Sequence, residues 1–154
     1  MDHSCLFCQI ANGEKPAFVF WENTDFMAFL SIYPNIIGFS VVIPRLHKTS
    51  YVFDQSAQDI SGIMEASRAA SLILQSRMSD VSRVGVMFEG FGVDHLHTKL
   101  FPMVGTGEMS QWSPIRSQVR HVFEKYEGYM SSHDGPQADS TSLQWLRDQL
   151  IRGT

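Results

Sequence analysis

The stretch VDHLHTKLFP, residues 93–102, places two histidines two positions apart in an apolar frame, with a lysine two positions further on. Side chains at alternate positions of a β-strand point to the same side, so His95, His97 and Lys99 are expected on one face. Such a row is compatible with a metal site or with a catalytic site. It is also compatible with an ordinary strand that carries two partly buried, hydrogen-bonded imidazoles.

The composition is that of a globular chain. Of 154 residues, 44% are hydrophobic and 18% are charged, which fits a single domain with its own core. The net charge of −4 gives no basic footprint, so no nucleic-acid partner is expected. Residues 1–17 lack the basic start and apolar core of a secretory signal, and no run approaches the roughly 20 apolar residues of a membrane helix. We therefore expect a cytoplasmic protein with no membrane partner.

Hydrophobic periodicity and turn signals give a mixed order of helices and strands. A short helix is expected to stop at Gly13, and Ser56 with Asp59 three residues on resembles an N-terminal capping box. The predicted helices are residues 5–12, 56–78, 115–130 and 143–152, and the predicted strands are residues 17–22, 25–32, 39–44, 83–90 and 95–103.

Tight turns between strands favour antiparallel pairing. The predicted class is therefore α+β, with a five-stranded antiparallel sheet, flanking helices and a C-terminal helical extension. Residues 1–110 are expected to form the main domain, and residues 111–154 a helical extension of that same domain.

Cys5 and Cys8, the two cysteines of the chain, form a C-x-x-C pair. In a reducing compartment such a pair indicates metal ligands or a redox motif. A thioredoxin-like redox pair follows a strand, and no strand is predicted before this one. Zinc needs four N or S ligands, so two distant histidines would have to complete the set. The candidates are His3, His47, His95, His97, His121 and His133. Spacing alone leaves a zinc site and two unrelated cysteines equally open.

The second histidine of the row has a chemical interpretation of its own. Neutral imidazole is a good nucleophile near pH 7 and forms covalent intermediates. Lys99 on the same face would place a cation beside a bound anion, which favours a phosphate over a carbonyl substrate. A lysine on a strand edge is, however, more often simply solvated.

Three segments together resemble the histidine triad family: HLHTKLFP (95–102), the N-terminal stretch CLFCQIANGEKPAFVFWENTDFMAFLSIYPN (5–35), and GFSVVIPRLHK (38–48). Residues 5–103 follow the family's order. The resemblance implies a five-stranded antiparallel sheet in a homodimer. It also implies a protein that binds nucleotides and hydrolyses or transfers nucleotidyl groups of dinucleoside polyphosphates or phosphoramidates.

The resemblance further assigns roles to residues. His97 matches the nucleophile that forms a nucleotidyl-histidine. The metal ligands, for one structural zinc ion per chain, would be Cys5, Cys8, His47 and His95. The substrate-binding residues would be Phe29, Ser31, Ile32, Phe91 and Lys99.

The chain departs from the family pattern around the expected pocket. Lys99 replaces the third histidine, Phe39 follows a strand-opening glycine where a histidine is common, and Ser31 replaces a ribose-binding aspartate. A lysine ammonium cannot accept a proton, and a serine offers one hydroxyl in place of a bidentate carboxylate. Phe91, in a shortened loop, and Trp112 could stack on a base, but a core or packing role is favoured for each.

Three functions follow. The leading one is a zinc-containing hydrolase or nucleotidyl transferase that cleaves a phosphoanhydride or phosphoramidate bond. The alternative is a non-catalytic nucleotide-binding or regulatory protein, favoured by the joint change at Ser31, Phe39 and Lys99. A zinc-stabilised structural module without a ligand rests on the cysteines and histidines alone.

Overall fold

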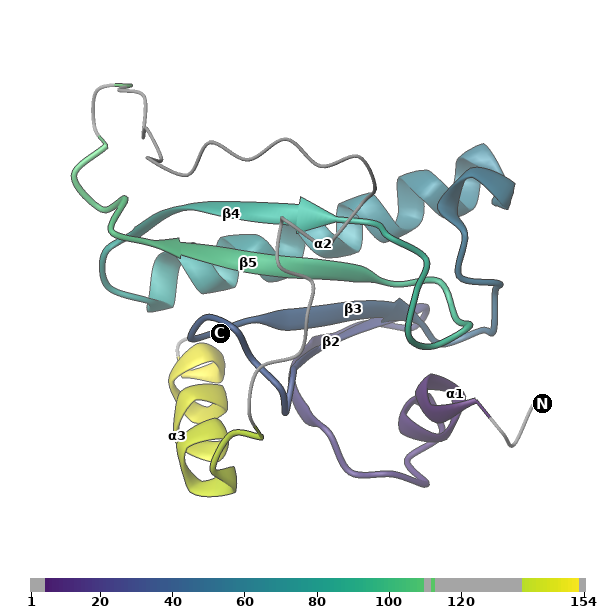
Figure 1. Cartoon of the computed structure of the whole chain (residues 1–154), viewed down its shortest axis with the longest axis horizontal. Helices are drawn as coiled ribbons and strands as arrows, with labels where there is room; N and C mark the ends of the chain where they lie inside the picture. The colour runs from purple at the N-terminus through teal and green to yellow at the C-terminus, as the bar shows by residue number, and fades with distance from the viewer. Residues whose placement is uncertain (1–4, 110–111, 113–136, 153–154) are drawn as a thin grey trace, which may run out of the picture.

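The computed structural model describes residues 5–109, 112 and 137–152. Its strands form one antiparallel sheet in the order β1-β2-β3-β5-β4 (Figure 1). The strands are β1 (Phe18–Glu22), β2 (Phe26–Leu30), β3 (Ser40–Pro44), β4 (Val81–Met87) and β5 (Thr98–Val104). The helices are α1 (Leu6–Ala11), the 3₁₀ turn η1 (Val52–Asp54), α2 (Ala57–Arg77) and α3 (Ser140–Ile151). The predicted class, the five-stranded sheet and the C-terminal helix are confirmed.

The two faces of the sheet are covered differently. One face packs against α2 and α3, and Figure 1 shows α2 running behind β4 and β5. The core on this side consists of Phe20, Ala28, Leu30, Val42, Ala66, Ala70, Leu74, Leu100, Leu143, Leu146 and Leu150. On the other face, α1 packs through Phe7 and Cys8 against β2 and β3. Because α1 is short, part of this second face is left for a pocket.

Local signals explain several element boundaries. Gly13 ends α1 in the left-handed region, with φ of 76°, where glycine carries no steric penalty. Asn23 closes the β1–β2 turn, since its Oδ1 accepts from the amides of Asp25 and Phe26 at 2.9 and 2.7 Å. Ser56 caps α2 by accepting from the Asp59 amide at 3.1 Å. The helix end predicted at Gly13 and the cap predicted at Ser56 are confirmed.

The predicted ends of the fourth and fifth strands are wrong. The ladder of β5 begins at Thr98 rather than at His95, because the His95 amide donates to the Val93 carbonyl and the Leu96 amide to the Lys48 carbonyl. In β4 the ladder covers residues 81–87 rather than 83–90. Side-chain alternation nevertheless begins before the ladder, since Leu96 packs into a core cluster with Val52 and Ile63.

The C-terminal helix covers one edge of the sheet. The contacts of α3 include β1, and the Arg147 Nε donates to the Val19 carbonyl at 2.9 Å. That carbonyl lies where the β1–β2 register shifts, between Val19 and Trp21. The helix predicted at 115–130 lies outside the described residues, and the division at residue 110 stays a prediction.

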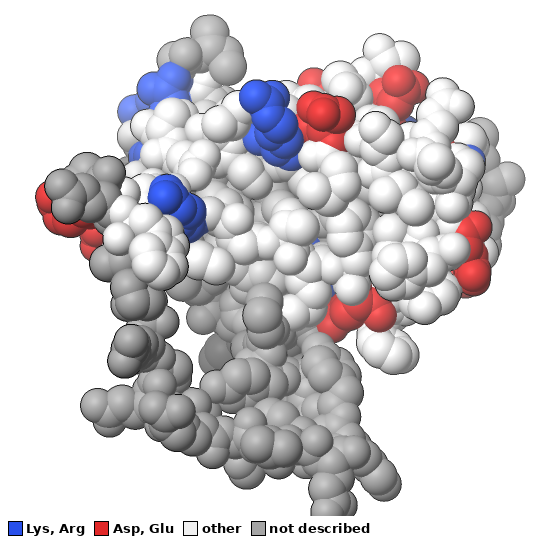
Figure 2. Space-filling model, turned by 90° about the horizontal axis from the view of Figure 1, so that it is seen from above, with Lys and Arg blue, Asp and Glu red and all other residues white. Residues whose placement is uncertain are grey.

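The surface carries charges of both signs. On the face drawn in Figure 2, the basic and acidic side chains of the described residues lie scattered among uncharged ones. None of the helices described is both long enough and apolar enough to cross a bilayer.

Candidate metal centre and adjoining pocket

Four side chains from three parts of the chain meet at the N-terminal end of α1. One ligand atom from each of Cys5, Cys8, His47 and His95 lies within 4.8 Å of every other. The Nδ1 of His95 is 3.4 Å from the Cys5 Sγ and 3.5 Å from the Cys8 Sγ. The His47 Nδ1 is 3.4 Å from the Cys8 Sγ. The spacing ambiguity in the sequence is therefore resolved in favour of a cluster.

These distances fit a tetrahedral zinc ion. With Zn–S near 2.3 Å and Zn–N near 2.0–2.1 Å, tetrahedral angles put sulfur and nitrogen about 3.6 Å apart. The ring of His95 is also turned correctly, because its Nε2 is 2.8 Å from the Pro44 carbonyl. A carbonyl can only accept, so Nε2 carries the proton and Nδ1 keeps its lone pair toward the sulfurs. A second-sphere carbonyl of this kind is a typical orienter of a metal-bound histidine.

The fold explains why distant residues converge. Cys5 and Cys8 are three positions apart at the start of α1, so one helical turn presents both sulfurs together. His47 follows β3 and His95 precedes β5, and these two strands are neighbours in antiparallel register. The end of β3 and the start of β5 therefore lie side by side.

His97 is close to this cluster but does not belong to it. Its side chain is 3% exposed, and its Nδ1 is 2.7 Å from the carbonyl of His95. The carbonyl accepts, so Nδ1 carries the proton and Nε2 is the basic nitrogen. Burial lowers the pKa of His97 below the ordinary value of 6.5, since desolvation disfavours the imidazolium. The ring is thus a neutral base at neutral pH, in one tautomer.

A pocket of about 960 Å³ opens on the same face of the sheet. It is large enough for a nucleotide-sized ligand, and most of its lining is apolar. His97 lines it, as do all the predicted substrate-binding residues: Phe29, Ser31, Ile32, Phe91 and Lys99. The structure therefore brings the predicted nucleophile and the predicted substrate contacts to one cavity, beside the metal cluster.

Two departures from the family pattern acquire a structural reason. Phe39 is buried and its ring lies 4.8 Å from that of Phe101, so this position serves packing beneath the pocket. Ser31 accepts from the Tyr33 amide at 3.1 Å and thereby shapes the turn at the pocket wall.

The expectation of a core role for the two aromatic residues is wrong. Phe91 is 67% exposed at the pocket and Trp112 is 78% exposed. Phe91 sits between Gly90 and Gly92, whose φ angles are 72° and 90°. The two glycines that flank Phe91 in the sequence were the signal for its exposure.

One ionic residue of the pocket was missed. Glu89 lines the cavity and forms an ion pair with Lys99 through Oε1 and Nζ. The signal was present in the hairpin, because Met87 pairs with Lys99 across β4 and β5. Residues 87 and 89 are two apart, so the Glu89 side chain reaches the same face. The exact register was needed to see this.

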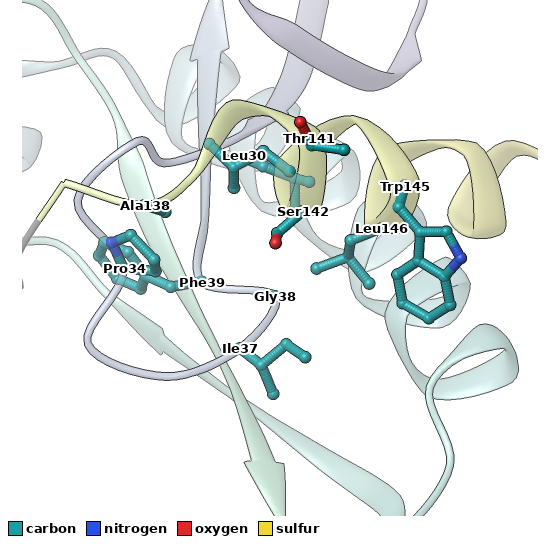
Figure 3. Close-up of a pocket in the computed structure, with 11 residues that line it drawn as sticks. Leu30, Pro34, Ile37, Gly38, Phe39, Ala138, Thr141, Ser142, Trp145 and Leu146 are labelled. Carbon is teal, nitrogen blue, oxygen red and sulfur yellow. The ribbon is translucent and has the colours of Figure 1, made fainter.

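A second pocket, of about 570 Å³, lies between α3 and the loop before β3 (Figure 3). Pro34, Ile37, Trp145 and Leu146 are among the residues that line it. The described residues around it include no ionisable side chain and none of the predicted site residues. It offers an apolar surface without the groups that phosphoryl chemistry needs.

Comparison with known proteins places the chain in a family. No family model matches it. A HIT-like protein of Mycoplasma pneumoniae is 30% identical over 112 residues, which cover 69% of this chain and 76% of the relative. The adenosine 5'-monophosphoramidase of Schizosaccharomyces pombe is 30% identical over 102 residues, which cover 64% and 74% of the two chains. The chain belongs to the histidine triad (HIT) family.

Solved structures agree on the fold. A zinc-bound histidine triad family protein from Mycobacterium smegmatis superposes with a TM-score of 0.63 at 20% identity. The superposition covers 96% of this chain and 93% of the other. At this identity the likeness supports the shared fold, and the site must be argued from the residues of this chain.

Proposed function

We propose that this protein is a hydrolase or nucleotidyl transferase that cleaves a phosphoanhydride or phosphoramidate bond through a nucleotidyl-His97 intermediate. The observation that carries the proposal is the hydrogen bond from His97 Nδ1 to the His95 carbonyl. It fixes the tautomer in which Nε2 is the nucleophile, in a cavity large enough for a nucleotide. The phosphoramidase activity named for the fission-yeast relative is chemistry of the same class.

The reaction then has two displacement steps. The Nε2 lone pair of His97 attacks the α-phosphorus, and the bond to the leaving group breaks with its electron pair. Water then attacks the same phosphorus, the P–N bond to His97 breaks, and the nucleoside monophosphate leaves. Lys99 would bind the phosphoryl oxygens, while Phe29, Ser31 and Ile32 would line the nucleoside side and Phe91 would stack on the base.

The metal in this proposal is one zinc ion per chain with a structural role. Cys5, Cys8, His47 and His95 would hold it, and their spacing and ring orientation support this. The zinc ion would supply a rigid anchor for α1 and for the His95 backbone. His95 in turn presents the carbonyl that orients His97. Two thiol ligands require a reducing compartment, which supports a location in the cytoplasm.

A homodimer is the proposed assembly. At one edge of the sheet, α3 and Arg147 cover β1. At the other edge lies β4, and no described element continues the sheet beyond it. An edge strand of this kind can pair with a second copy across a two-fold axis.

The alternative function is a nucleotide-binding or regulatory protein without turnover. Its supporting observation is that Phe39 fills a position beneath the pocket and Lys99 is already paired with Glu89. Either change could weaken catalysis while leaving a nucleotide-sized cavity in place.

A trapping experiment separates the two functions. The zinc-loaded protein is mixed with adenosine 5'-phosphoramidate or a dinucleoside polyphosphate, quenched in base, and analysed by intact mass spectrometry. We expect an adenylyl adduct on His97 and release of AMP. His97→Ala should lose the adduct and lower turnover by at least about a thousandfold, while the protein still folds and keeps its zinc content. Tight AMP binding with wild-type turnover equal to that of His97→Ala would favour the alternative.

A further inference from the structure

Beside the proposed nucleophile lies a largely buried ion pair. Glu89 and Lys99 join through Oε1 and Nζ, and their side chains are 9% and 14% exposed. Both line the same pocket as His97. Lys99 belongs to β5, whereas Glu89 stands two residues beyond the end of β4.

The pair sets the charge at this end of the cavity. The described ionisable residues that line the pocket are Lys15, Tyr33, Glu89, His97 and Lys99. Lys15 is exposed, so the charged groups shielded from solvent are Glu89 and Lys99. The charges of Glu89 and Lys99 sum to zero. Shielded charges are screened by salt much less than surface charges, so a bound anion would experience both.

We propose that Glu89 is a specificity-determining residue that selects phosphoryl ligands of low negative charge. An anion that contacts Lys99 Nζ must also approach the Glu89 carboxylate, because the carboxylate already accepts a hydrogen bond from that ammonium group. The attraction by Lys99 and the repulsion by Glu89 then nearly cancel for every negative charge of a ligand, so neither offsets the cost of desolvating the anion, which rises steeply with its charge. Phosphate esters and amides with one charge are therefore favoured over polyanions.

This inference rests on the proposed function, because it narrows the substrate of the same site. A phosphoramidate monoester or a phosphodiester carries one negative charge at phosphorus, whereas a terminal phosphate carries about two near neutral pH. A polyphosphate leaving group carries more. Of the two bond types that the proposed function allows, the one with a leaving group of low charge is therefore favoured.

The test is a charge series on one nucleoside. Calorimetric titration of the zinc-loaded full chain uses adenosine, adenosine 5'-methylphosphate, AMP and ATP, which differ in charge and share the base. The variant Glu89→Gln keeps the side-chain shape and removes its charge. We expect it to raise affinity for AMP and ATP on the order of tenfold, with ATP gaining most and adenosine unchanged. Glu65→Gln, on the exposed side of α2, makes the same net charge change and should alter none of the four.

A double variant checks that charge is the cause. The double variant Glu89→Gln, Lys99→Gln has no charge at either position, so the net charge of the two residues is zero, as in the wild type. The preference of this variant between ATP and adenosine 5'-methylphosphate should therefore return toward that of the wild type. A gain for ATP that persists in the double variant overturns the inference. So does a uniform loss of anion affinity in Glu89→Gln, which would mean that the carboxylate serves to hold Lys99 in place for the anion.

Inorganic ions separate this inference from the proposed function. Phosphate and pyrophosphate need only the anion end of the pocket, and Glu89→Gln should favour pyrophosphate over phosphate more than the wild type does. If adenosine and AMP do not bind but this change is seen, the nucleotide function fails and the charge selection stands. If nucleotides bind and turn over but the change is absent, the charge selection alone is overturned.

Discussion

His95 connects two chemically different neighbours. Its ring nitrogens reach the cysteine sulfurs and the Pro44 carbonyl, and its backbone carbonyl holds His97. One residue therefore offers its side chain to the proposed metal site and its backbone to the proposed nucleophile. Of the two histidines, His95 lies in the candidate metal site and His97 lines the pocket.

Two glycines with positive φ angles, Gly13 and Gly38, allow the cost of tight packing near the sheet to be separated from backbone strain. Gly38 has φ of 79°, and a Cβ built there would lie 2.6 Å from the Met78 Sδ and 3.1 Å from the Pro102 Cγ. Gly13 has a similar φ of 76° but nothing within 4 Å. We expect Gly13→Ala to cost about 1 kcal/mol of unfolding free energy through backbone strain alone. Gly38→Ala should cost about 1–2 kcal/mol more, because neighbours must shift.

Urea denaturation of both variants measures the difference. Equal losses at the two glycines would mean that Met78 moves aside without cost, and that the space above Gly38 is not constrained. Any larger loss at Gly13 would contradict the packing argument.

At the scale of elements, α2 is held at its start by a side-chain cap. The Ser56 Oγ accepts from the Asp59 amide and lies 2.7 Å from the Asp59 Oδ2, to which its hydroxyl donates. Ser56→Ala should lower the unfolding free energy by about 1 kcal/mol. Ser61→Ala, on the exposed side of the same helix, is the matched control and should be close to neutral.

The capping effect should depend on pH. The hydrogen bond from Ser56 is the largest cause that lowers the pKa of Asp59 below its ordinary value of 3.8, followed among the lowering causes by Lys48. A depressed carboxyl pKa contributes stability above the unfolded value, and that contribution is lost as pH falls through the folded value. The deficit of Ser56→Ala should therefore shrink below about pH 3.8, whereas a deficit independent of pH would mean that the Asp59 carboxylate contributes nothing to the cap.

The short helix α1 depends on the metal cluster in our proposal. Six residues are too few for a helix to be stable alone, and α1 contributes Cys8 and Phe7 to the second core cluster. Removing zinc with a strong chelator should lower the melting temperature by at least about 5 °C and increase amide exchange in α1 first. The same chelator saturated with zinc beforehand is the control. Unchanged melting after verified zinc removal would contradict a structural role for the metal.

At the scale of the whole molecule, the assembly is predicted from β4, the last strand of the sheet, beyond which no described element continues it. Light scattering on the eluted protein should give twice the 17.4 kDa chain mass. Val86 on β4 is exposed, and Val86→Lys should shift the protein toward the monomer by placing like charges across the shared edge. Leu46→Lys, in the exposed loop after β3, adds the same charge away from that edge and should leave the mass unchanged. A monomeric wild-type protein would contradict the proposed homodimer.

Sequence reasoning reached the fold because its signals are local. Alternation, Gly13 and the Ser56 cap each act within a few residues of their position. The strand ends near His95 depend on the Lys48 carbonyl, and the docking of α3 depends on Arg147 reaching Val19 across 128 positions. Such contacts are decided by tertiary packing, which composition does not encode.

Part of the candidate site, like part of the fold, could be predicted from the sequence, and part could not. Spacing alone could not choose among six histidines, and the family resemblance supplied His47 and His95, which the structure places beside the cysteines. Glu89 escaped detection because its pairing with Lys99 depends on the β4–β5 register. The ion pair inside the pocket can therefore be predicted only once the residue pairing between β4 and β5 is known.

The packing of Leu96 restricts how this sequence can change in length. His95 and His97 face the cluster and the pocket, while Leu96 between them is held in the core with Val52 and Ile63. Inserting or deleting one residue here would exchange the two faces, sending an imidazole into the core and a leucine toward the two cysteines. The loop of residues 90–93, with the left-handed Gly90 and Gly92, lies outside the strand ladders and is not bound by this alternation. Insertions and deletions among related chains should therefore occur in that loop and be absent at His95. The loop is accordingly the segment in which changes of length could alter ligand specificity without disturbing the two histidines.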